Sequence, residues 1–98
     1  MKNIAKPTEK IIKIDVREVD GAIYTYRLTE SMPRKIGKLS IPLYSIYIEM
    51  KRGSETDENS IKDIFADVGK ALTFYSTLLK HLATPIDLHY ILEDRITL

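Results

Sequence analysis

The feature that most constrains the fold is a pair of amphipathic helices predicted in residues 67–96 and separated at Thr84-Pro85. In the first helix, apolar residues recur every three or four positions, as they do on the buried face of a helix. That face comprises Val68, Ala71, Leu72, Phe74, Tyr75, Leu78, Leu79 and Leu82. Asp67 precedes it and is a suitable N-cap, because its carboxylate can accept a hydrogen bond from an amide of the first turn.

Pro85 ends the first helix, because proline lacks an amide hydrogen and clashes with the preceding turn. Proline is well suited to the first position of a new helix. Thr84 would then be the N-cap, and the charge of Asp87 would favour the positive end of the helix dipole. We predict a second helix from Pro85 to about Arg95. Its buried side would consist of Leu88, Ile91, Leu92 and Ile96.

Three earlier segments, residues 10–19, 22–28 and 43–51, alternate between apolar and polar residues with the period of two that is typical of strands. We predict a fourth strand at residues 60–65, and loops or turns at residues 30–41 and 52–59. Residues 1–98 would form a single α+β domain, with residues 1–8 as a flexible arm. Its three- to four-stranded antiparallel sheet, built from two hairpins, would have one face covered by the two C-terminal helices.

The connection between the first two strands determines which face each side chain occupies. A two-residue turn at Asp20-Gly21 would place Val16 opposite Thr25 and Ile14 opposite Arg27, which mixes apolar and polar residues on one face. A three-residue loop, Val19-Asp20-Gly21, would align the apolar rows of the two strands. We therefore predict the longer loop, with Gly21 in the left-handed conformation. Ile12, Ile14 and Val16 would then face the helices.

The C-terminal segment 85–94 resembles the end of an uncharacterised family of small Firmicutes (clostridial-type) proteins. The pattern is a proline, a leucine, two aliphatic residues and a Glu-Asp pair, here Pro85, Leu88, Ile91, Leu92, Glu93 and Asp94. The match covers about the C-terminal half of the chain. The family is a domain of unknown function, so the resemblance implies a fold and a bacterial cytoplasmic setting but no activity.

Composition excludes several classes of site. The chain has no cysteine, so neither disulfides nor thiolate zinc sites can form. A net charge of +1 provides no general attraction to nucleic acid or anionic membranes. No apolar run reaches membrane-spanning length, and the first residues lack the hydrophobic segment of a signal peptide. We expect a soluble cytoplasmic protein with no cofactor and no membrane contact.

No residue pattern predicts a catalytic or metal site. His81 and His89 match no metal-binding spacing, and a helix-end cation and a solvent-facing ring are the simpler interpretation. Glu93 and Asp94 are adjacent, so on a helix they diverge by roughly 100° and cannot act as a paired acid and base. A small oligomeric enzyme stays the third interpretation, and it would need a pocket lined by His89, Tyr90 and Asp94.

Two surfaces are candidates for binding. On the sheet face away from the helices we expect an apolar patch, which would mark a protein partner or a second copy of the chain, although scattered exposed apolar residues explain it equally well. Its residues are Ile11, Ile23, Leu43 and Tyr47. A basic cluster in a loop could instead hold a phosphate or a nucleic-acid backbone, although a solvated charge run explains it more simply. Its residues are Arg34, Lys35 and Lys38. The leading hypothesis is a non-enzymatic protein-interaction module that can form a homodimer, and the alternative is a binder of nucleic acid or another anion.

Overall fold

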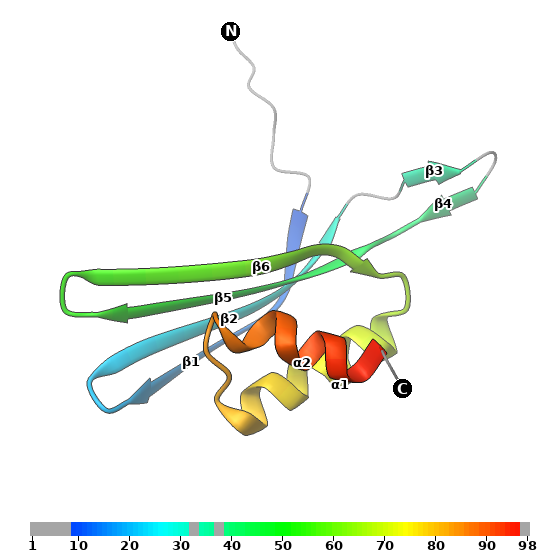
Figure 1. Cartoon of the computed structure of the whole chain (residues 1–98). Coiled ribbons are helices and arrows are strands. Elements are labelled where there is room, and N and C mark those ends of the chain that lie inside the picture. Colours follow the sequence, from blue (N-terminus) through cyan, green and yellow to red (C-terminus); the bar gives the residue numbers. More distant parts are fainter. Residues whose placement is uncertain (1–8, 32–33, 37–38, 97–98) are drawn as a thin grey trace, which may run out of the picture.

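The computed structural model describes residues 9–31, 34–36 and 39–96. Along them lie β1 (Glu9–Val19), β2 (Ala22–Ser31), β3 (Arg34–Ile36), β4 (Leu39–Ile41), β5 (Tyr44–Arg52), β6 (Glu55–Phe65), α1 (Val68–His81) and α2 (Asp87–Ile96). Four strands form an antiparallel sheet in the order β1-β2-β5-β6, and both helices lie on one face of it (Figure 1). The predicted α+β fold is confirmed. β3 and β4 form a separate hairpin.

The hydrophobic core lies between the helices and the middle of the sheet. Its sheet half comes from β2, β5 and β6, whose fully buried residues include Tyr26, Leu28, Ile46 and Ile48. The helical half is Ala71, Phe74, Tyr75 and Leu78 of α1, with Leu88 and Leu92 of α2. The two helices therefore bury the faces that their apolar spacing predicts, and the side chain of Ile96, predicted on the buried side of the second helix, lies outside the described part. Val68 and Leu82, at the two ends of the first face, are each 41% exposed.

The side chains that the sequence predicts as caps hold the start of α1 and the corner between the two helices. Asp67 accepts a hydrogen bond from the Gly69 amide at 2.8 Å, so it caps α1. At the corner between α1 and α2, the Thr84 amide donates to Asp87 Oδ2 at 3.0 Å, and the Asp87 amide donates to Thr84 Oγ1 at 3.3 Å. This reciprocal pair is a capping box in which aspartate replaces the usual glutamate. The α-helix itself begins at Asp87, two residues later than predicted.

Two segments predicted as loops contain strands. Residues 30–41 include the end of β2 and the β3-β4 hairpin, and residues 52–59 include most of the first half of β6. The side chains of residues 55–58 are exposed, because the β5-β6 hairpin extends past the helices (Figure 1). A strand that meets water on both faces has no apolar alternation, so the sequence pattern misses it.

The predicted three-residue loop between β1 and β2 is wrong. Val19 pairs with Ala22, so Asp20 and Gly21 alone form the turn. Both residues have positive φ, 50° and 81°, as a two-residue type I′ hairpin turn requires. Val16 therefore lies opposite Thr25, and Ile14 lies opposite Arg27. This register moves Ile14 and Val16 to the face opposite that predicted, and they are 54% and 55% exposed.

Two irregularities shape the edges of the sheet. In β1 the register shifts between Ile11 and Lys13, so Ile12 is an extra residue, and it packs against the core. In β6 the register shifts opposite the stretch between Tyr44 and Ile46, and Asp63 there has a φ of 53°. The Asp63 amide donates to the buried Ser45 hydroxyl at 2.8 Å. The irregularity explains why the apolar spacing of residues 61–64 did not resemble a regular strand.

Candidate interaction surface

The sheet face away from the helices, here called the back face, carries a row of exposed aliphatic side chains along β1 and the start of β2. Ile11 is 53% exposed and Ile23 is 47% exposed, values similar to those of Ile14 and Val16. The register places Val16 diagonally across from Ile23 on this face. We call Ile11, Ile14, Val16 and Ile23 the β1 strip. Contiguous exposed apolar side chains on one face are typical of a contact surface.

Tyr47 of β5 lies on the back face and is separated from the β1 strip by strand β2. Its hydroxyl is 2.6 Å from Glu9 Oε1 of β1, and the Arg27 guanidinium lies 4.9 Å from its ring centroid. Tyr47 is thus half-buried and already bonded within the chain. Burial and the hydrogen bond to Glu9 raise the pKa of Tyr47 to about 12. The interaction connects strands β1 and β5 and limits the β1 strip on one side.

The opposite side of β1 is polar. The Tyr75 hydroxyl of α1 is 2.8 Å from Asp15 Oδ2 and 2.9 Å from the Tyr26 carbonyl oxygen. Burial, together with the hydrogen bond to Asp15, raises the pKa of Tyr75. Arg17 lies 3.9 Å from Asp15 Oδ1, and its guanidinium donates to the Val16 carbonyl at 3.0 Å. Asp15 and Arg17 therefore occupy the helix-side rim of this edge strand, and the aliphatic Ile14 and Val16 occupy its back, with Glu18 next along the strand.

The residues predicted for a partner surface separate into two groups. Ile11 and Ile23 lie in the β1 strip, whereas Tyr47 is bonded to Glu9 and Leu43 lies half-buried ahead of β5. Sequence reasoning missed Ile14 and Val16, which it placed in the core. The signal that could have found them is the Asp20-Gly21 dipeptide, which strongly favours a two-residue turn.

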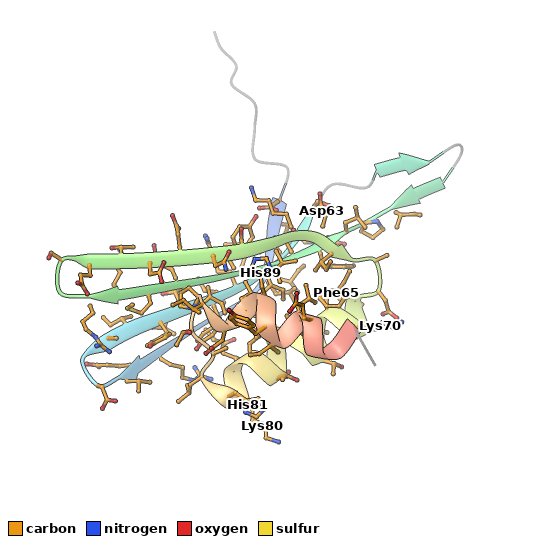
Figure 2. All side chains as sticks on the ribbon, viewed as in Figure 1. Asp63, Phe65, Lys70, Lys80, His81 and His89 are labelled. Carbon is orange, nitrogen blue, oxygen red and sulfur yellow. The ribbon has the colours of Figure 1, made fainter. Side chains whose placement is uncertain are left out.

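The two histidines do not come together, and the side chains of the basic cluster lie outside the described part of the chain. Arg34 and Lys35 lie on β3, but their side chains and Lys38 lie outside the part of the chain that the structure describes. His81 and His89 are both exposed and come from different helices, and Figure 2 shows them well apart. Among the described residues, no three His, Cys, Asp or Glu side chains converge as metal ligands would. Tyr90 is 67% exposed, and the Asp94 side chain is outside the described part.

A half-open cleft of about 550 Å³ lies where β6 leads into α1. It is lined mainly by apolar side chains, including Phe65, Phe74 and Leu92, with Asp67, Lys70 and Thr73 at the start of α1. Figure 2 labels Phe65 and Lys70 at this junction. Asp67 is engaged in capping the helix. Of the residues predicted for a pocket, His89 and Tyr90 are not part of its lining, and the Asp94 side chain lies outside the described part.

Among the described residues, the helices lack the combined length and apolar character of a membrane span. No curated protein and no solved structure matches the chain. A family model with the description "Family of unknown function (DUF6514)" matches residues 6–98. The expectation of a family of unknown function is confirmed, and the match covers almost the whole chain rather than its C-terminal half. The chain belongs to this family of unknown function, DUF6514.

Proposed function

We propose that this chain is a protein-interaction module and that the β1 strip is its contact surface. The supporting observation is that Ile14 and Val16 are more than half exposed on a strand of the sheet. Their side chains contribute little to the core of the domain, so burying them against another protein would be favourable. The bacterial cytoplasmic setting implied by the C-terminal resemblance is part of the proposal.

The position of the strip within the sheet favours a protein as its partner. β1 is an edge strand, so its outer backbone groups have no neighbouring strand among the described residues. An extended segment of another protein can add to such an edge through main-chain hydrogen bonds, while apolar side chains beside it provide specificity. An aliphatic row beside an open strand edge meets both requirements.

Site-specific photo-cross-linking in the native cell tests the proposal. A photo-reactive residue at Ile14 or Ile23 should give discrete cross-linked protein products. The matched control is Ile86, which is also apolar and is 66% exposed but lies in the turn before α2. Products from the two strip positions and none from Ile86 would support the proposal. Equal products from all three positions, or none from the strip, would contradict it.

A further inference from the structure

We propose that the partner of the β1 strip is a second copy of this chain, and that two β1 strands pair antiparallel with Val16 opposite Val16 of the second copy. This inference rests on the proposed function and specifies the occupant of the surface. Paired in this way, two four-stranded sheets would become one continuous eight-stranded sheet. A twofold axis through Val16 and perpendicular to the sheet would keep both helix layers on the same side.

The backbone of β1 is arranged for such pairing. Val19 and Ala22 flank the two-residue turn, and the residues flanking a turn of this kind form a hydrogen-bonded pair. Because hydrogen-bonded and non-bonded pairs alternate along an antiparallel ladder, Val16 directs its amide and carbonyl toward the open edge. The hydrogen bond from the Arg17 guanidinium to the Val16 carbonyl shows that this carbonyl is accessible there.

The regular part of β1 has its midpoint at Val16. The irregularity at Ile12 interrupts the strand on one side, and the turn at Asp20 ends it on the other. Seven residues, 13–19, lie between these interruptions. An antiparallel pair that uses all seven residues in both copies is centred on Val16, because residue 13 then meets residue 19 of the second copy. A pair centred on Ile14 would include the irregular position.

Charge complementarity selects the same register. In the pair centred on Val16, Asp15 lies opposite Arg17 of the second copy, and the contact occurs twice. Opposite charges that face each other across a strand pair are stabilising, and like charges are destabilising. A pair centred on Asp15 would place Asp15 opposite itself and Lys13 opposite Arg17. A pair centred on Arg17 would place Arg17 opposite itself. A pair centred between two residues would place the back face of one copy beside the helix-side face of the other, so the apolar row of one strand would meet the charged row of the second.

On the back face this register joins the apolar side chains of the two copies. Val16 of each copy contacts the other at the centre, and Ile14 of each copy lies diagonal to Val16 of the other. With Ile23 of both copies, they form an apolar centre across the junction, and Glu18, the partner of Ile23 within the chain, lies opposite Ile14 of the other copy at each end of it. On the helix side the helices pack mainly over β2, β5 and β6, and α1 reaches β1 through the hydrogen bond from the Tyr75 hydroxyl to Asp15. Arg17 would release the Val16 carbonyl to the amide of the second copy and bind the opposing carboxylate.

Single cysteine substitutions test the register, because the natural chain has no cysteine. Val16→Cys, Ile14→Cys and Ile23→Cys replace similarly exposed residues of one face. Directly opposed strand residues lie close enough for a disulfide, whereas residues several positions apart do not. Under mild oxidation, Val16→Cys should give a rapid disulfide-linked dimer, and the other two variants should not. A dimer from Ile14→Cys alone, or equal rates from all three variants, would overturn the register.

Charge reversal provides a second test that does not depend on oxidation. Asp15→Arg and Arg17→Asp each place like charges opposite one another in a homodimer, so each variant alone should sediment as a monomer. An equimolar mixture should restore the dimer, because every opposed pair is then complementary. Lys13→Glu is the control and should leave association unchanged. Circular dichroism would establish that each variant is folded, because Asp15 also contacts Tyr75.

The result for the unaltered chain separates the two proposals. Sedimentation equilibrium from micromolar to millimolar concentration should show a monomer–dimer equilibrium. A chain that stays monomeric throughout would overturn the second copy as the partner. The proposed function would then still depend on whether the strip positions cross-link to a different protein in the cell. Stronger association of Arg17→Asp than of the unaltered chain would show that Arg17 protects the edge, which would also overturn this inference.

Discussion

The Tyr75 hydroxyl of α1 lies 2.8 Å from the Asp15 carboxylate of β1, which joins two elements that are 60 positions apart in the sequence. The same hydroxyl is 2.9 Å from the Tyr26 carbonyl. Tyr75 therefore connects the helix layer to both strands of the first hairpin. The contact lies on the helix side of β1, where the register places Asp15, and Ile14 and Val16 lie on the back face.

Tyr75→Phe should lower the free energy of unfolding by about 1 to 2 kcal/mol, because it removes a buried hydroxyl that donates to a carboxylate. Chemical denaturation monitored by circular dichroism measures the change. Tyr90→Phe is the matched control, because Tyr90 is 67% exposed on α2. Its effect should stay within about 0.5 kcal/mol. Equal effects of the two substitutions would contradict the role assigned to Tyr75.

Ile14→Ala and Ile46→Ala compare two isoleucines at even positions of alternating strands. Ile46 is fully buried, so its truncation should cost about 2 to 5 kcal/mol. Ile14 is 54% exposed, and its truncation should change the free energy of unfolding by less than about 1 kcal/mol. The comparison should be made at a low protein concentration, where association makes no contribution. Similar large costs at both sites would place Ile14 in the core and contradict the observed register.

Alkaline pH should destabilise the fold through Tyr26. Burial is the main cause that raises its pKa from 10.0 to about 12. The unfolded chain loses this proton near pH 10, whereas the folded chain keeps it until about pH 12. The folded state then binds more protons, so its stability falls as the pH rises between these values. Urea denaturation at stepped pH should show the fall, and Tyr26→Phe should show a shallower one. Parallel profiles would exclude Tyr26 as a cause.

Much of the fold could be predicted because local chemistry determines it. The helix ends follow from Asp67 as a cap and from the inability of Pro85 to continue α1. The buried faces of β2 and β5 follow from the alternation around Tyr26 and Ile46. In these central strands one face packs against the helices and the other faces away from them. The period of two therefore indicates the core face directly.

The candidate surface could not be predicted in full, because alternation does not indicate which face of an edge strand is covered. The alternation of β1 predicts that its apolar row faces the helices, and only a three-residue loop is compatible with that placement. In the structure the conformational preference of Asp20-Gly21 determines the register, and Ile14 and Val16 are left exposed. The helices pack mainly over β2, β5 and β6, so the helix-side face of β1 is covered less and can carry charged residues. Local turn chemistry was therefore more reliable than the assumption of a single apolar face.

Residue-resolved amide hydrogen exchange in β1 distinguishes an open strand edge from a paired one. The amides of Asp15 and Arg17 face β2 and should be protected at every protein concentration, whereas that of Val16 faces the open edge. Exchange at Val16 should be fast in dilute solution and should slow several-fold as the protein concentration rises. Exchange at Val16 that stays fast at every concentration would contradict pairing through this edge, and protection of Val16 in the dilute monomer would contradict the assignment of its amide to that edge.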